Sequence, residues 1–242
     1  MTTTPLGTQM DYGTVAQWVG ATATLLAVLV ALFKDEFLRW RRKPELRVSI
    51  ALASPDCHKT TLNYVVQKTA LTCRAADCYY LRIWVENVGK TRAERIQVFA
   101  AKLLKRHADG SFKEVKDFLP MNLLWTHGQE GKSGPEIFAE GISPQMGKHC
   151  DLGHIVDPKY RKDVGYDLPT VAPDDTVLAL DLEVKPNTLS HLVPPGVYRL
   201  ELRVAAANCS PVNHTLEITI TGKWFTEQTR MFSDGLGIRT IS

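Results

Sequence analysis

The stretch WVGATATLLAVLVALFKDEFLRWRRK, residues 18 to 43, decides how the rest of the chain is organised. Residues 13 to 33 carry no charged side chain. A helix of this length, rising about 1.5 Å per residue, covers roughly 30 Å, which is the thickness of the hydrocarbon core of a bilayer. Trp18 and Trp40 lie near its two ends, where amphipathic rings favour the headgroup region. We predict a single transmembrane helix; the alternative is a buried helix that is apolar all round.

The residues that flank the apolar stretch predict its orientation. Residues 1 to 11 contain no Lys or Arg, so we expect no cleaved secretion signal, which would need positive charge before its apolar core. Basic residues instead follow the stretch, which places the main domain in the cytoplasm and the N-terminus outside. We expect the last four of them to contact anionic lipid headgroups of the bilayer. The basic residues are Lys34, Arg39, Arg41, Arg42 and Lys43.

Small residues recur along the same stretch at spacings of three and four. This spacing places them along one stripe of a helix, where the backbone of a second helix can approach closely. We therefore expect a homo-oligomer that forms through this stripe, although Ala is also simply common in membrane helices. The stripe consists of Ala16, Gly20, Ala23, Ala27 and Ala31.

Composition sets further limits on function. The chain has 242 residues, with 29 Lys and Arg against 26 Asp and Glu, and the small excess of positive charge comes mostly from the cluster after the apolar stretch. This balance indicates no nucleic-acid-binding surface. The five cysteines are odd in number and scattered, which is typical of reduced thiols in a cytosolic domain.

After residue 43 the sequence alternates apolar and polar residues, as half-buried strands do. Leu81, Ile83 and Val85 should face a core, and residues 96 to 100 should form the partner strand after a turn. Pro- and Gly-rich turns between such segments predict an antiparallel β-sandwich, so the fold class is mainly β with an N-terminal helix. The expected organisation is a short extracytoplasmic N-terminus (1–12), the helix with its basic extension (13–43), a sandwich (44–225) with an irregular insertion (119–175), and a C-terminal tail (226–242). Further expected strands cover 45–53, 178–182, 198–204 and 216–220, with a hairpin at 109–110.

One segment carries a resemblance to known proteins. VENVGKTRAERIQV, residues 85 to 98, has an Asn-x-Gly turn and a following Ala between two alternating strands. It resembles the repeat of immunoglobulin-like, adhesion-related bacterial domains. The complete layout is similar to bacterial proteins that join a single N-terminal span to such a sandwich. The resemblance implies a fold and a location in the bacterial inner membrane, and it carries over no catalytic residue.

The irregular insertion is where we expect a ligand, because long loops on a rigid scaffold often form binding sites. The segment GQEGKSG ends like a phosphate-binding loop but lacks its first glycine. The segment HCDLGH could supply zinc ligands or a Cys150 nucleophile, yet its spacing matches no established site. We therefore predict no catalytic residue, no metal and no cofactor. The candidate ligand-binding residues are His127, Lys132, His149, Asp151 and His154.

These observations lead to three hypotheses. The first is a non-enzymatic, membrane-anchored binding or sensing module that recognises a protein or small ligand near the bilayer. The second is a membrane-perturbing effector of a bacterial defence system, in which the sandwich senses a signal and clustered helices disturb the bilayer. The third is a metal- or Cys-dependent hydrolase centred on HCDLGH.

Overall fold

The computed structural model describes residues 12–65, 73–126 and 137–241, which belong to two compact units, Met1–Lys43 and Pro44–Ser242. The first unit contains helix α1 (Tyr12–Arg41). Within α1, the 19 residues Ala16–Lys34 have a mean hydropathy of 1.9, and none of them is buried. The predicted N-terminal helix is therefore confirmed as one that is long and apolar enough to cross a membrane.

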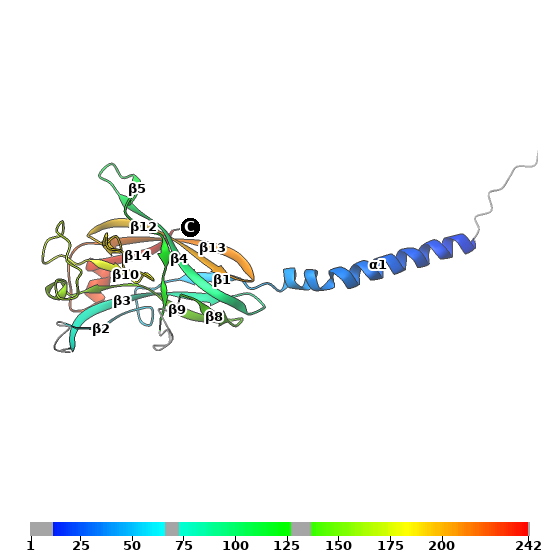
Figure 1. Cartoon of the computed structure of the whole chain (residues 1–242), viewed down its shortest axis with the longest axis horizontal. Helices are drawn as coiled ribbons and strands as arrows, with labels where there is room; N and C mark the ends of the chain where they lie inside the picture. The colour runs from blue at the N-terminus through cyan, green and yellow to red at the C-terminus, as the bar shows by residue number, and fades with distance from the viewer. Residues whose placement is uncertain (1–11, 66–72, 127–136, 242) are drawn as a thin grey trace, which may run out of the picture. The chain divides into compact units, whose positions relative to one another are not determined.

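The second unit is an antiparallel β-sandwich, as predicted, and Figure 1 shows its two sheets as separate layers. The first sheet has the order β1-β3-β9-β10-β11, with β2 also paired to β3 and β7 to β9. Its strands are β1 (Leu46–Ser49), β2 (Cys57–Val65), β3 (Cys73–Asn87), β7 (Leu124–Trp125), β9 (Met146–Val156), β10 (Leu178–Leu180) and β11 (Leu192–Val193).

The second sheet has the order β14-β13-β12-β4-β5, with β6 and β8 also paired to β4. Hairpins connect β4 to β5 and β12 to β13, and the first of them contains the predicted turn at Gly110, whose φ of 81° favours glycine. Its strands are β4 (Ala93–Arg106), β5 (Phe112–Glu114), β6 (Met121–Asn122), β8 (Ala139–Ile142), β12 (Gly196–Ala206), β13 (Cys209–Ile220) and β14 (Leu236–Ile241).

The main core lies between the two sheets. Alternate residues of each strand point inward, because successive side chains of a strand lie on opposite faces. Leu81, Ile83 and Val85 are completely buried there, as predicted. The expected inward faces of 178–182, 198–204 and 216–220 also belong to this core. The pairing of β12 with β13 continues to Ala206 and Cys209, so both strands extend beyond the expected ranges 198–204 and 216–220 and the loop between them is short.

The prediction that residues 96 to 100 pair with β3 is wrong. They lie in β4, which pairs with β12 in the second sheet, while β3 pairs with β9 in the first. Asn87 explains the crossing. Its completely buried amide accepts from Gly89 N at 3.0 Å and donates to the carbonyls of Thr91 and Ile142 at 2.7 and 2.9 Å. These bonds turn the chain from one sheet to the other instead of into a hairpin.

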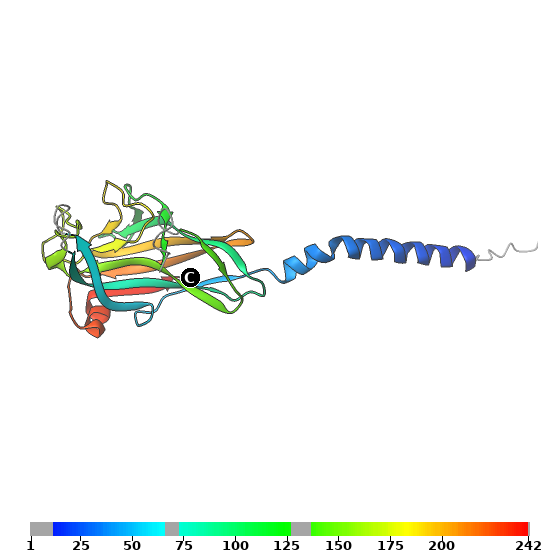
Figure 2. The same cartoon turned by 60° about the horizontal axis from the view of Figure 1, so that its bottom comes forward.

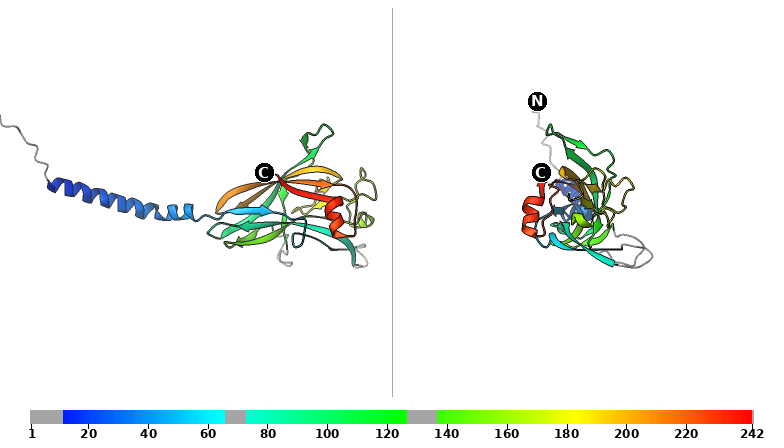
Figure 3. Two further views of the ribbon diagram at one scale, coloured as in Figure 1. Left: turned by 180° about the vertical axis from the view of Figure 1, so that it is seen from behind. Right: turned by 90° about the vertical axis from the view of Figure 1, so that its left-hand side faces the viewer.

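Two predicted boundaries also need correction. The expected insertion at 119–175 contains β9, which lies at the centre of the first sheet, and only its part from residue 157 onward is free of strands. The expected tail at 226–242 contains two short helical turns and β14, which pairs with β13 along six residues. The turns, Gln228–Arg230 and Met231–Gly235, appear in red beside β14 in Figures 2 and 3. The sequence analysis missed β9 and β14 because charged residues and glycines interrupt their apolar pattern.

A second, smaller apolar cluster covers part of the outer face of the first sheet. Ala76 and Cys78 of β3 belong to it, whereas Tyr79 belongs to the main core, so the two clusters lie on opposite faces of the sheet. Residues 157–177 fold over this cluster without strands. Arg161 organises them: its buried guanidinium donates to the carbonyls of Ala172 and Asp175 at 2.8 and 2.7 Å.

Candidate functional site

A β-bulge brings the polar residues of β9 to one face of the first sheet. Asp151 and His154 are three residues apart and would lie on opposite faces of a regular strand. The register between β3 and β9 shifts at this point, because Leu81 pairs with Gly153 and Arg82 with Asp151. Leu152 is therefore an extra residue on β9. The bulge leaves His154 and Asp151 on the same outer face of the sheet.

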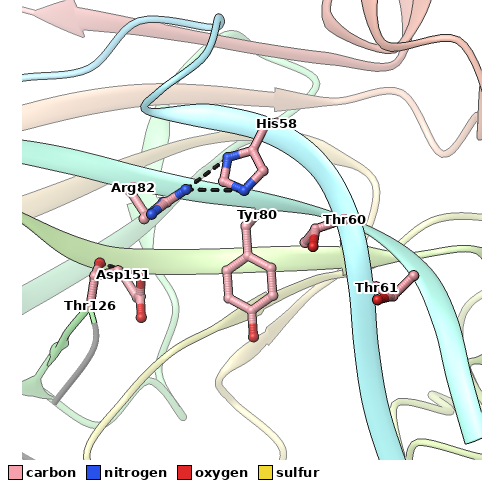
Figure 4. Close-up of a pocket in the computed structure, with 7 residues that line it drawn as sticks. All are labelled: His58, Thr60, Thr61, Tyr80, Arg82, Thr126 and Asp151. Carbon is pink, nitrogen blue, oxygen red and sulfur yellow. Dashed lines mark hydrogen bonds between the residues drawn. The ribbon is translucent and has the colours of Figure 1, made fainter. Parts of the chain in front are cut away.

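The open part of this face contains a shallow pocket of about 270 Å³. Strands β2 and β3 form most of its wall, and β9 and the end of β7 close the other side (Figure 4). Each described lining residue carries a polar group, and three threonines and a tyrosine contribute hydroxyl groups. The lining residues are His58, Thr60, Thr61, Tyr80, Arg82, Thr126 and Asp151.

The charged groups of the pocket are held in fixed directions. Arg82 donates to the imidazole of His58, with Nη2 2.8 Å from Nδ1, so its guanidinium is turned toward β2. Burial, and after it the neighbouring Arg82 charge, lowers the pKa of His58. On the other side, Thr126 donates to the carboxylate of Asp151 at 2.6 Å. A cation and an anion thus lie on opposite sides of the pocket floor.

A buried hydrogen-bonded chain supports Tyr80 from behind. Its ring stacks on His154 with the centroids 5.0 Å apart. His154 is only 3% exposed, and its Nδ1 lies 3.0 Å from an oxygen of Asp181, to which it donates. On the other side of the ring, Nε2 is hydrogen-bonded to the hydroxyl of Tyr166, 2.8 Å away. Because Lys185 also lies over the Tyr166 ring, residues from four segments fix the position of this stack.

The predicted site residues do not form one site. Asp151 lines the pocket, and His154 lies buried behind it. His149 is on the same face but further along β9, where its Nε2 lies 3.0 Å from Asp56 and its ring contacts Trp84. His127 and Lys132 lie outside the described residues.

The Trp84 side chain continues the outer face beyond the pocket. Its indole lies directly on Gly147, because a Cβ built on that glycine would be 2.3 Å from the ring. The ring also contacts His149, with the centroids 4.7 Å apart. Any side chain at position 147 would therefore displace the indole.

Cys150 lies on the opposite side of the sheet from these histidines. It is completely buried in the main core, and its thiol donates to the carbonyl of Leu124 at 3.2 Å. Burial raises the pKa of the Cys150 thiol well above its ordinary value. The sheet thus separates Cys150 from His154, and the two form no nucleophile and base pair. Within the described ranges, no three His, Cys, Asp or Glu side chains converge as metal ligands would.

The residues predicted to contact the membrane or a second helix are found as follows. All five members of the small-residue stripe, Ala16, Gly20, Ala23, Ala27 and Ala31, are exposed on α1. Arg42 and Lys43 are also exposed, while the side chains of Arg39 and Arg41 lie outside what the structure describes.

Sequence reasoning missed most of the pocket. Alternation along β3 places Arg82 and Tyr80 outward, which was a usable signal for those two residues. His58, Thr60 and Thr61 come from β2, which the sequence analysis did not identify. No local sequence pattern predicts that β2 lies beside Tyr80, because the pairing of β2 with β3 is a contact between separate strands.

These features define a class of protein: a mainly β chain in which an apolar N-terminal helix precedes an antiparallel sandwich with a polar pocket on one outer face. Comparison of the chain with protein families, with curated proteins and with solved structures found no match.

Proposed function

We propose that this protein is a membrane-anchored, non-enzymatic binding module whose β-sandwich recognises a small polar ligand in the pocket between β2, β3 and β9. The observation that carries this proposal is the pocket itself. Polar side chains converge there on a rigid sheet, and a buried chain of hydrogen bonds fixes the central ring. Sites built on strands with such support hold their geometry well enough to recognise a ligand.

The proposed anchor is α1. Between residues 16 and 34 its apolar side chains are exposed on every side of the helix. Contact of these side chains with water is unfavourable, whereas their contact with lipid is not. The basic residues that follow it favour the sandwich on the cytoplasmic side of a bacterial inner membrane, with the N-terminus outside. The proposal includes self-association of the protein through the small-residue stripe of α1, since small side chains let two helices approach closely in lipid.

We further propose that the sandwich is immunoglobulin-like. Support comes from the connection at Asn87, which carries the chain from one sheet to the other between consecutive strands. Crossings of this kind are typical of Greek-key sandwiches.

The test blocks the pocket without assuming a particular ligand. NMR spectra of the full-length protein in detergent micelles are recorded with a library of small polar fragments. Ligands should shift the amide resonances of β2, β3 and β9 and should be recovered chemically unchanged. The variant Thr60→Trp fills the pocket and should abolish these shifts, whereas Thr215→Trp, on the outer face of the second sheet, should leave them intact.

Two results would overturn the proposal. The first is a set of fragment shifts that is scattered over both sheets and is unaffected by Thr60→Trp. The second is conversion of a fragment into a product by the wild-type protein but not by the blocked variant.

A further inference from the structure

Among the described residues that line the pocket, Arg82 is the only arginine or lysine, and its charge is incompletely matched. In the part of the chain that the structure describes, no carboxylate lies within 4.0 Å of its guanidinium. Among the described side chains its hydrogen-bond partner is the imidazole of His58, and within the same residues its buried Nε has no partner. Because the Nε is buried, a ligand in the pocket can be held only through the Nη atoms of Arg82, whose positive charge no described carboxylate offsets at short range.

The acceptor chemistry follows from the guanidinium group. Its nitrogens form a planar fork that matches the oxygens of a carboxylate or a phosphate. Thr60 and Thr61, on the neighbouring strand β2, line the same pocket beyond His58 and Tyr80, where their hydroxyl groups can contact the remainder of the ligand (Figure 4). The guanidinium of Arg82, on the side of the pocket nearest His58, is therefore the group suited to an oxyanion.

The opposite side of the pocket excludes a second oxyanion. Asp151 is the cross-strand neighbour of Arg82 in the β3–β9 register, but its carboxylate is turned the other way, toward Thr126, whereas the guanidinium is turned toward His58. Like charges at such short range repel, most strongly where the surroundings exclude water. A ligand with one anionic group can place it near β2, but a ligand with anionic groups at both ends cannot.

The size and lining of the pocket limit the remainder of the ligand. Small-molecule sites commonly measure about 300 to 1,000 Å³. At about 270 Å³ the pocket falls just below that range, which suits a ligand with one ring. Tyr80 presents a ring to the pocket, and the threonine hydroxyls can exchange hydrogen bonds with hydroxyl groups on the ligand.

We propose that the pocket binds a hydroxylated small molecule of monosaccharide size with a single oxyanion, which Arg82 holds on the β2 side of the sheet. A sugar acid supplies this group as a carboxylate, and a sugar phosphate supplies it as a phosphate ester. This inference rests on the proposed function, because it names the ligand of the same pocket.

The first experiment is calorimetric titration of the full-length protein, in a detergent and buffer free of sugar and phosphate, with D-glucuronate, D-glucose 6-phosphate and D-glucose. We expect at least one acidic probe to bind, and glucose to bind at least tenfold more weakly, because a hydrogen bond to a charged group contributes at least that factor. The two acidic probes distinguish a carboxylate from a phosphate.

Variants connect the binding to Arg82. Arg82→Gln should weaken binding of the acidic probe at least tenfold and remove most of the difference in affinity between the acidic probe and glucose. Arg203→Gln is the matched control, because Arg203 is an exposed arginine on the second sheet. Thermal melting of each variant shows whether it is folded, and Arg82→Lys, which keeps the charge without the fork, should fall between wild type and Arg82→Gln.

A second arm tests the exclusion by Asp151. D-glucarate, with a carboxylate at each end, should bind the wild type at least tenfold more weakly than glucuronate. Asp151→Asn can still accept from Thr126, and it should remove most of this difference. Equal binding of glucarate and glucuronate to the wild type would contradict the assigned polarity of the pocket.

The failure of this inference can be separated from that of the proposed function. If glucose binds as well as the acidic sugars, or if Arg82→Gln keeps full affinity for them, the oxyanion assignment is wrong and the pocket remains a ligand site. If no acidic probe binds while other fragments shift β2, β3 and β9, the ligand class is wrong and the binding module stands. If Thr60→Trp also leaves all fragment shifts unchanged, both proposals fail.

Discussion

Replacing Asn87 with Ala should destabilise the sandwich more than any other single polar-to-Ala change at the sheet crossing. The side-chain oxygen accepts from Gly89 N at 3.0 Å and from Glu45 N at 3.2 Å, and the nitrogen donates to the carbonyls of Thr91 and Ile142 at 2.7 and 2.9 Å. Gly89 and Ile142 are buried, so water cannot replace the lost partner. Each unsatisfied buried group costs about 1 to 3 kcal/mol, so the two together cost roughly 2 to 6 kcal/mol.

That loss is large compared with the total stability of a domain, which is about 5 to 15 kcal/mol. The assay is urea unfolding of the full-length protein in nonionic detergent, followed by tryptophan fluorescence. The midpoint should fall with little change in slope. The control is Asn63→Ala, at an exposed position of edge strand β2, which should change stability by less than about 0.5 kcal/mol. A loss at Asn87 below about 1 kcal/mol would show that the amide does not hold the crossing together.

Three further predictions concern the site and the helix. Arg82→Gln removes a neighbouring positive charge, so the lowered pKa of His58 should rise toward its ordinary value in an NMR pH titration; an unchanged pKa would refute the contact. Cys73 is the exposed cysteine, so an impermeant maleimide should label it rapidly after cell lysis and not in intact cells, and labelling of intact cells would reverse the proposed orientation. Ala27→Asp places a charge in the small-residue stripe and should abolish cross-linked oligomers of the full-length protein in lipid, whereas persistence of these oligomers would exclude the stripe as the interface.

The sequence predicted the sandwich because its strongest signal, alternation along long strands, is also what drives burial. Leu81, Ile83 and Val85 are inside for the reason the pattern gives: their neighbours are polar and the strand has a period of two. The alternation does not say which strand is the neighbour. The assignment of β4 as the partner of β3 therefore failed, since the decision to cross between sheets depends on Asn87 and on contacts with β1 and β8 that are distant in the chain.

The site was less predictable for a related reason. HCDLGH was singled out as a cluster of reactive side chains, and Asp151 does line the pocket, but the bulge at Leu152 decides which residues of this segment share a face. A bulge is a property of the pairing between β3 and β9, so it cannot be recognised from the sequence of β9 alone. His58 and Thr60 were missed because β2 contributes to the pocket only through its register with Tyr80.

The geometry of β9 also explains why binding, and not nucleophilic catalysis, is our proposal for this face. A cysteine nucleophile needs a base within hydrogen-bond reach and a thiol that ionises. Cys150 points into the core, while its potential base His154 faces the other way and is already held between Asp181 and Tyr166. The same hydrogen bonds that occupy His154 keep Tyr80 in place at the pocket. Residues that look reactive in the sequence thus form a support, and the groups left facing the pocket are a guanidinium, a carboxylate and hydroxyls, which are suited to holding a polar ligand in one orientation.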